Sequence, residues 1–216
     1  MALGIYGTGA VLVDPLTTPA LIYVVDDDPL IGLASAALLR GAGYIVRSFI
    51  SPGAFLAAFD PEVPGCVVTD LVMPEMSGIQ LQSLLAMHEY CPPIIFVSGK
   101  GDVKTTAAAM KAGAVDFLCK PVQPDEFLAA VHEAVSKDAE LRANLERRRR
   151  VRGLVDKLTP QERDVLGLLV QGFPNKVIAA RLGRGERTIK HHKKKLMGKM
   201  GVRSAAALLQ VLVDGA

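Results

Sequence analysis

Acidic, hydroxyl and basic side chains follow four apolar segments of this sequence, and together these groups could carry out phosphoryl chemistry. The polar residues that directly follow such segments are Asp26 and Asp27, Asp70, Ser98 and Lys120. Clustered carboxylates repel one another unless a cation lies among them. An all-oxygen set of ligands without Cys or His suits a hard ion such as Mg²⁺. One aspartate could then accept a phosphoryl group as an acyl phosphate, while an ammonium group offsets its negative charge.

The elements that must bring these groups together are alternating strands and helices. We predict strands over residues 21–25, 44–49, 66–69, 94–97 and 115–118, and helices over residues 29–41, 51–59, 78–88, 103–112 and 125–136. Apolar strands that alternate with helices indicate a parallel sheet covered on both faces, here a flavodoxin-like (βα)5 domain with strand order 2-1-3-4-5. The carboxyl ends of such strands form the ligand-binding edge. Asp28, which precedes Pro29, is predicted to be a helix N-cap.

The rest of the chain reads as helices only. We assign residues 1–20 to an N-terminal extension without a role, 21–138 to the α/β domain, 139–155 to a helical linker and 156–216 to an all-α helix-turn-helix domain. Thr159, Pro160 and Glu162 form a capping-box pattern at the start of the first short helix. Asn175 and Ser204 are predicted to cap the second and fourth helices, and the third runs from Glu186 to about Met200.

Charge divides the chain into an acidic half and a basic half. Residues 1–138 contain 7 Lys/Arg against 15 Asp/Glu, whereas residues 139–216 contain 18 against 7. This division indicates two domains with different partners, and the basic half favours nucleic acid. The run Arg147–Arg150 is interpreted first as a solvated face, and the alternative is contact with DNA phosphates.

The third helix of the basic half has a basic face. Arg187, Lys190, His191 and Lys194 follow the spacing i, i+3, i+4 and i+7, so they share one side of the helix. A basic face on the second helix of a helix-turn-helix is typical of a recognition helix in the major groove of DNA.

Five motifs in this order make the sequence resemble a two-component response regulator of the FixJ/NarL (LuxR-type) subfamily. The motifs are VVDDDP, VTDLVMPEMSG, FVSGKGD, MKAGAVDFLCKP and LTPQERDVL…NKVIAARLG…RTIKHH. The resemblance implies that Asp70 is the phosphoacceptor and that Asp26, Asp27, Asp70 and the backbone carbonyl of Val72 bind Mg²⁺. It also implies that Ser98 is a switch hydroxyl, that Lys120 pairs with the phosphate, and that the peptide bond before Pro121 is cis. Phe117 matches the switch aromatic position, and the alternative is an ordinary core residue.

The same resemblance implies that the second domain binds DNA and recognises its sequence. Base contacts are expected from Lys190, His191 and Lys194, and phosphate contacts from Lys176, Arg187, Thr188 and His192. Two positions depart from the family pattern. Arg184 stands where an apolar residue is usual, and Gly185 stands where a Ser/Thr-type N-cap is usual, which costs a few tenths of a kcal/mol.

The expected function is phosphorylation-controlled binding to a DNA operator, with a histidine kinase as phosphate donor and a homodimer as the phosphorylated form. The protein is not expected to be a metabolic enzyme. One alternative is a haloacid-dehalogenase-like phosphohydrolase with Asp26 as nucleophile, although Leu30 replaces the usual Thr/Val of that motif. The other alternative is a phosphorylation-independent DNA binder with a degenerate receiver.

The three cysteines and the apolar runs indicate a cytoplasmic protein. Cys66, Cys91 and Cys119 form no CxxC pair and lie in or beside apolar runs, which is typical of reduced, packed thiols. No apolar run approaches the roughly 18 residues of a membrane span. The first 20 residues lack the basic segment and cleavage pattern of a signal peptide.

Overall fold

The structure is a computed structural model that describes residues 20–99 and 103–215. Most of the predicted N-terminal extension, residues 1–19, lies outside this described part. Of the described residues, those up to Leu141 form one compact unit and those from Arg142 onward form the other.

A parallel sheet forms the centre of the first unit. Its strands within the described residues are β1 (Leu21–Val25), β2 (Ile45–Phe49), β3 (Gly65–Thr69), β4 (Ile94–Ser98) and β5 (Asp116–Cys119), in the order β2-β1-β3-β4-β5. The predicted order 2-1-3-4-5 is therefore confirmed. In this register Val25 lies opposite both Phe49 and Thr69. Because these three strands end level, the residues that follow β1 and β3, Asp26 and Asp70, are neighbours.

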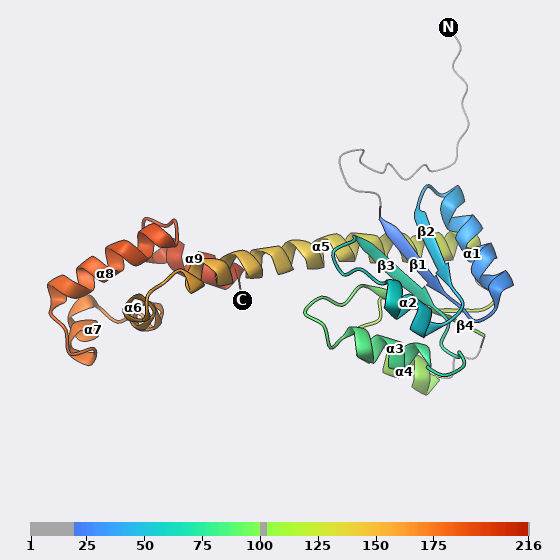
Figure 1. Cartoon of the computed structure of the whole chain (residues 1–216), viewed down its shortest axis with the longest axis horizontal. Helices are drawn as coiled ribbons and strands as arrows, with labels where there is room; N and C mark the ends of the chain where they lie inside the picture. The colour runs from blue at the N-terminus through green and yellow to red at the C-terminus, as the bar shows by residue number, and fades with distance from the viewer. Residues whose placement is uncertain (1–19, 100–102, 216) are drawn as a thin grey trace, which may run out of the picture. The chain divides into compact units, whose positions relative to one another are not determined.

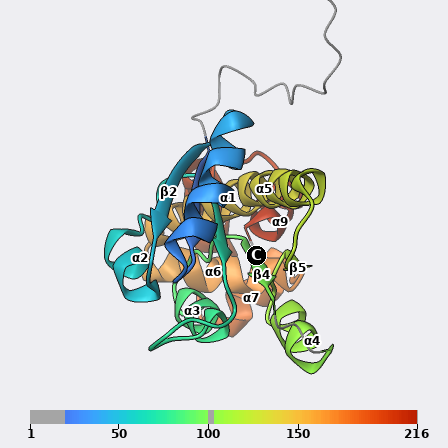
Figure 2. The ribbon, with the colours of Figure 1, turned by 90° about the vertical axis from the view of Figure 1, so that its right-hand side faces the viewer.

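Helices cover both faces of the sheet (Figures 1 and 2). On one face lie α1 (Pro29–Gly41) and the first part of α5 (Pro124–Asp156), which pack on strand residues such as Ile22 and Ile95. On the other face lie α2 (Pro52–Ala58), α3 (Gly78–Leu85) and α4 (Val103–Lys111), which pack on residues such as Tyr23 and Phe96. All side chains of β1, β3 and β4 are buried, as expected for parallel strands between two helical layers.

Local sequence sets where most helices begin. Asp28 is the N-cap of α1 and accepts a hydrogen bond from the backbone N–H of Leu30 at 2.9 Å, as predicted. Most elements start and end within three residues of the predicted positions. The exception is α5, because the predicted helix over residues 125–136 and the segment 139–155 form one continuous helix. Its added residues are mostly Ala, Leu, Glu and Arg, which all have high helix propensity.

The second unit contains the end of α5 and four shorter helices among the described residues. These are α6 (Pro160–Val170), α7 (Asn175–Arg181), α8 (Glu186–Lys199) and α9 (Ala205–Asp214). One core cluster joins α6, α7 and α8 through Val165, Ile178 and Ile189. A second cluster joins α6, α8 and α9, and Leu154 and Val155 at the end of α5 pack against it. The last turns of α5 are thus part of the folded body of this unit.

Helix caps in the second unit follow the prediction except at α7. Thr159 and Glu162 form the predicted capping box of α6, and Ser204 caps α9. The prediction that Asn175 caps α7 is wrong, because Asn175 is already helical and Pro174 occupies the cap position. The carbonyl of Pro174 accepts the first helical hydrogen bond, from the N–H of Ile178 at 3.1 Å.

The cysteines differ in exposure. Cys66 is buried in β3 and Cys91 is partly buried, but Cys119 is exposed, so the prediction of a packed thiol is wrong at that position. Cys119 belongs to an edge strand and follows Leu118, whose side chain points to the buried face. Across residues 20–99 and 103–215, no helix has both the length and the apolar character needed to traverse a bilayer.

Candidate functional site

An ion-pair network joins three strand ends at the carboxyl edge of the sheet. The Nζ atom of Lys120 lies 2.8 Å from Oδ2 of Asp26 and 2.6 Å from Oδ2 of Asp70. The backbone fixes both acids, since the N–H of Asp26 donates to the carbonyl of Phe49 and the N–H of Asp70 donates to that of Val25. The structure thus brings together three side chains that sequence reasoning placed at this edge.

The carboxylates of this edge form a donor set that fits a hard divalent cation. Asp26, Asp27 and Asp70 each offer one oxygen, and these atoms lie within 4.8 Å of one another. Asp26 is buried, whereas Asp27 is exposed. Lys120 neutralises part of the charge, but three carboxylates still exceed one ammonium group by two negative charges. An all-oxygen group with this excess suits Mg²⁺.

Burial and hydrogen bonding act against each other on Lys120. Burial lowers the pKa of the ammonium group because it disfavours the charged form. Hydrogen bonds to Asp26 and Asp70 favour the charged form, and the net result is that the pKa of Lys120 is raised. Lys120 therefore carries a positive charge at neutral pH.

The loop after β3 contacts Asp70, whose side chain is 13% exposed. The N–H of Val72 donates to Oδ1 of Asp70 at 3.1 Å, and 57% of the Val72 residue is exposed. The chain then returns at Gly78, where an added Cβ atom would lie 2.4 Å from the carbonyl oxygen of Asp70 and 2.8 Å from the ring of Phe96. Glycine is therefore required for this close approach. The sequence analysis predicted a helix that begins at residue 78 but missed this contact.

Two further predicted site residues lie near this edge in different environments. Ser98 is buried at the end of β4, and its carbonyl accepts a hydrogen bond from the N–H of Lys120 at 2.9 Å. Phe117 in β5 is half-buried, with its ring centroid 6.2 Å from that of Phe96. The peptide bond between Lys120 and Pro121 is cis, as the resemblance implied.

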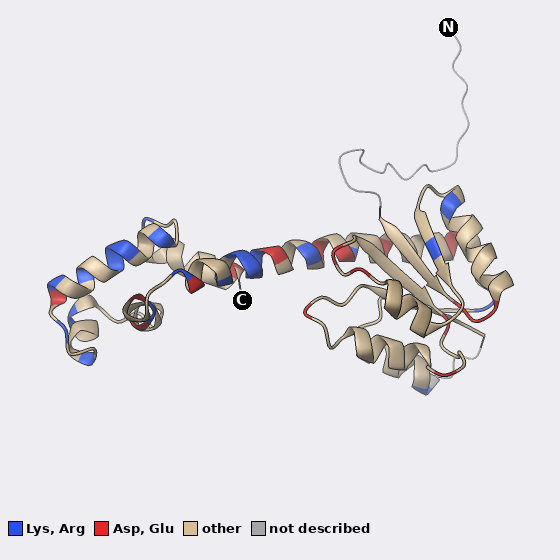
Figure 3. Cartoon of the chain, in the orientation of Figure 1, with Lys and Arg blue, Asp and Glu red and all other residues tan. Residues whose placement is uncertain are grey.

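The predicted DNA-contact residues are mostly exposed in the second unit, and Figure 3 shows blue Lys and Arg segments along the ribbon of α8. Those that are exposed are Lys176, Arg187, Thr188, Lys190, His191 and Lys194. His192 is half-buried, with its ring 6.1 Å from that of His191. The opposite side of α8 buries Ile189 and Leu196. This helix therefore has one packed side and one cationic side.

The turn before α8 accommodates both departures from the family pattern. Gly183 has a left-handed φ of 60°, and the N–H of Arg184 closes the turn by donating to the carbonyl of Ala179 at 3.0 Å. The side chain of Arg184 is exposed, so its charge stays in solvent. Gly185 adopts the extended N-cap backbone that the family pattern requires, although glycine has no side-chain acceptor.

The sequence analysis did not predict several contacts of charged side chains. Lys190 lies 3.3 Å from Glu186 one turn earlier, a pair detectable from its i,i+4 spacing. Lys199 lies 2.6 Å from the buried Glu162, which belongs to another helix. Asp138 in α5 is buried and accepts hydrogen bonds from the N–H of Gly65 and from the hydroxyl of Tyr90. The contacts of Glu162 and of Asp138 join residues far apart in the chain, so only the tertiary fold shows them.

Each of the two parts of the chain matches a known protein family. Residues 22–132 match the family described as "Response regulator receiver domain". Residues 156–212 match the family described as "Bacterial regulatory proteins, luxR family". The first match contains the acidic edge, and the second contains α6 to α8 and most of α9.

Individual proteins match over nearly the whole chain. The response regulator protein TmoT of Ectopseudomonas mendocina is 37% identical, over 89% of this chain and 87% of its own. The transcriptional regulatory protein FixJ of Rhizobium meliloti (strain 1021) is 36% identical, over 92% and 97%. The solved structure of the response regulator StyR covers 90% of this chain and 98% of its own, with 39% identity and a TM-score of 0.75.

Proposed function

The chain belongs to the response regulators that join a receiver domain to a LuxR-type DNA-binding domain, and from this premise we propose that phosphorylation of Asp70 controls its binding to DNA. The observation that carries the proposal is the position of Lys120, whose ammonium group contacts both Asp26 and Asp70 at aligned strand ends. Proteins of this family are transcription regulators and not metabolic enzymes. The proposed receiver spans residues 21–138, the linker 139–155 and the DNA-binding domain 156–216.

Each side chain of the site has a separate role in the proposed phosphoryl transfer. A carboxylate oxygen of Asp70 forms the new bond to phosphorus as the P–N bond of a phosphohistidine in the partner kinase breaks. Lys120, whose ammonium group contacts Asp70, offsets the charge of the phosphoryl oxygens. Asp26, Asp27, Asp70 and the carbonyl of Val72 would hold Mg²⁺, which supplies further neutralisation of the phosphoryl group.

Ser98 and Phe117 connect the phosphorylated edge with the neighbouring surface. Ser98 is buried at the end of β4, and its hydroxyl can hydrogen-bond a phosphoryl oxygen on Asp70. Phe117 packs against the ring of Phe96, so a shift of β4 reaches β5 and α4. This surface then favours a homodimer, which places two DNA-binding domains on one operator.

The DNA-binding domain supplies two kinds of contact. Lys190, His191 and Lys194 of α8 read bases in the major groove, whereas Arg187, Thr188, His192 and Lys176 position the domain on phosphates. The exposed cationic side of α8 and its packed opposite side support this division. A regulator of this kind works on chromosomal DNA, so we place it in the cytoplasm.

The test compares the parent protein with Asp70→Asn in the presence of Mg²⁺ and a small phosphodonor such as acetyl phosphate. We expect the parent to gain phosphate, to form dimers and to bind DNA more tightly, and we expect Asp70→Asn to do none of these. Asp60→Asn, which makes the same change before β3, is the matched control and should behave as the parent. Equal phosphate uptake by Asp70→Asn would refute the assignment.

The same experiment separates the two alternatives. A haloacid-dehalogenase-like phosphohydrolase would turn over a phosphomonoester through Asp26, which the membership in a family of regulators argues against. A degenerate receiver would leave DNA affinity unchanged by the phosphodonor and by Mg²⁺. The intact set of Asp26, Asp27, Asp70 and Lys120 supports an active receiver over a degenerate one.

A further inference from the structure

The last turns of α5 carry a dense basic surface that the functional assignment has not used. Between Arg142 and Lys157 the chain has 7 basic and 2 acidic residues, and five of the six residues from Arg147 to Arg152 are arginine. Arg147, Arg148, Arg149 and Arg150 are all exposed. A helix that merely faces solvent commonly mixes charges of both signs, because like charges at i,i+3 and i,i+4 repel.

This basic segment is fixed to the DNA-binding unit. Leu154 and Val155 pack against the core of that unit, and the side chain of Arg163 in α6 donates a hydrogen bond to the carbonyl of Asp156 at 3.1 Å. Gly215 at the end of α9 approaches Val151 so closely that an added Cβ atom would lie 2.5 Å from the Val151 Cβ atom. The arginines therefore belong to the same folded body as α8.

Two of the arginines line a groove together with the end of α8. Arg147 and Arg150 are one turn apart on α5, and both border the groove that Lys199 and Val202 line on its other side. Asp214 of α9 is the carboxylate of this groove, and it accepts a hydrogen bond from Gln210 at 2.7 Å. Lys199 is paired with Glu162, so the two arginines face the single carboxylate of Asp214, which leaves an excess of one positive charge.

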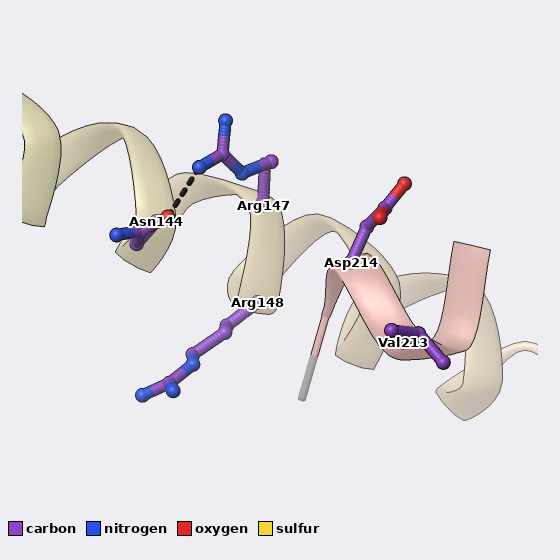
Figure 4. Close-up of a pocket in the computed structure, with 5 residues that line it drawn as sticks. All are labelled: Asn144, Arg147, Arg148, Val213 and Asp214. Carbon is purple, nitrogen blue, oxygen red and sulfur yellow. Dashed lines mark hydrogen bonds between the residues drawn. The ribbon is translucent and has the colours of Figure 1, made fainter. Parts of the chain in front are cut away.

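The arginines also point to different sides of the helix. Figure 4 shows Arg147 and Arg148 leaving α5 in different directions, with Arg147 bonded to Asn144 of the preceding turn. Successive residues are about 100° apart on a helix, so four consecutive arginines surround most of it. Arg147 and Arg150 are three residues apart and share one side of α5, so these two can contact the phosphates of one duplex together.

We propose that the arginines of α5, with Arg147 and Arg150 as the central pair, form a second DNA-binding surface that contacts phosphates beyond those reached by α7 and α8. The proposal rests on the proposed function, because it requires the second unit to bind duplex DNA. The contacts are to the sugar-phosphate backbone, so they add affinity without reading sequence. They also increase the dependence of binding on salt, since each neutralised phosphate releases bound counterions.

The test measures the DNA affinity of the full chain at several salt concentrations, using a random-sequence duplex several helical turns long. For Arg147→Gln/Arg150→Gln we expect the slope of log K against log salt to decrease in magnitude by about 2, at roughly 0.9 per phosphate contact. Lys111→Gln/Lys137→Gln removes the same charge from exposed positions of the first unit. This control should keep the slope of the parent, which excludes an effect of net charge alone.

A second measurement distinguishes backbone contact from base reading. On an operator selected from a random library, Arg147→Gln/Arg150→Gln should lose affinity by the same factor as on the random duplex. Lys194→Gln should lose more on the operator. An unchanged salt slope in a folded Arg147→Gln/Arg150→Gln protein would overturn the inference and assign the arginines to a protein partner or to solvent. Absence of DNA binding by the parent would instead overturn the proposed function.

Discussion

At the scale of single residues, the position of Asp70, the proposed phosphoacceptor, depends on close backbone contacts as much as on charge. Asp70 is held by the carbonyl of Val25, by Lys120 and by the N–H of Val72, and each of these groups comes from a different segment. The loop can return to α3 only because residue 78 lacks a Cβ atom. The geometry of the site therefore depends on a residue that takes no part in the chemistry.

This requirement predicts the effect of Gly78→Ala. The new methyl group would lie 2.4 Å from the carbonyl oxygen of Asp70, so the loop must move. We expect a loss of about 1–3 kcal/mol in the free energy of unfolding by urea, as for other overpacked sites, together with slower phosphate uptake.

The matched control is Gly53→Ala in α2, where the described part of the chain offers no heavy atom within 4 Å of an added Cβ atom. We expect this control to raise stability by up to about 1 kcal/mol, because alanine favours the helix. Equal stability of the two variants would mean that residue 78 does not require glycine.

At the scale of elements, an ion pair joins the end of α8 to the start of α6. Lys199, in the last turn of α8, contacts Glu162 at 2.6 Å, and Glu162 also accepts the N–H of Thr159 at 2.9 Å. Glu162 is buried. One carboxylate therefore completes a helix cap and anchors the neighbouring helix, so its charge contributes to the position of α8.

The ionisation of Glu162 predicts a pH dependence of stability. The hydrogen bond from Lys199, and then that from Thr159, lower the pKa of this carboxyl below its ordinary value of 4.5. A folded-state pKa below the unfolded-state value means that the stabilisation is complete above pH 4.5 and is lost as the pH falls through the lowered pKa. Glu162→Gln should lower the free energy of unfolding by about 1–2 kcal/mol at neutral pH and by less in acid.

Urea unfolding at a series of pH values checks this expectation. Asp164→Asn, an exposed position on the same helix, is the control and should follow the parent at every pH. The lowest pH of the series is 2, on the order of two units below the ordinary glutamate pKa. If the free energies of unfolding of Glu162→Gln and the parent differed by the same amount down to this pH, the role of the charge would be contradicted.

At the scale of the whole molecule, the chain has two units with separate apolar cores. The sheet and its helices enclose clusters that contain Ile95 and Phe96, whereas the second unit is built around Leu196 and Ile178. The helix α5 contributes side chains to both units. Units with separate cores are expected to unfold as separate cooperative transitions.

Calorimetry of the full chain tests this expectation with variants already described. We expect two thermal unfolding transitions. Gly78→Ala should lower the midpoint temperature of only one of them, and Glu162→Gln should lower that of only the other. The parent and Gly53→Ala serve as references. If each substitution instead shifted a single common transition, α5 would be coupling the two units into one cooperative body.

The sequence by itself determined the order of the strands, most helix boundaries and the side chains that meet at the carboxyl edge. Apolar runs, N-caps and strand-end polar residues are local signals, and parallel topology brings equivalent strand ends to one edge. It also indicated the cationic side of α8, because helical spacing alone fixes which residues share a side.

Only the tertiary structure decided the rest. It showed the contact of Lys120 with two carboxylates, the need for glycine at residue 78, the burial of Glu162 against Lys199 and the groove shared by Arg147 and the end of α8. It also joined the predicted last helix and linker into α5 and exposed Cys119. Apart from the continuity of α5, which local helix propensity favours, these features depend on distances between atoms far apart in the chain, which neither periodicity nor composition encodes.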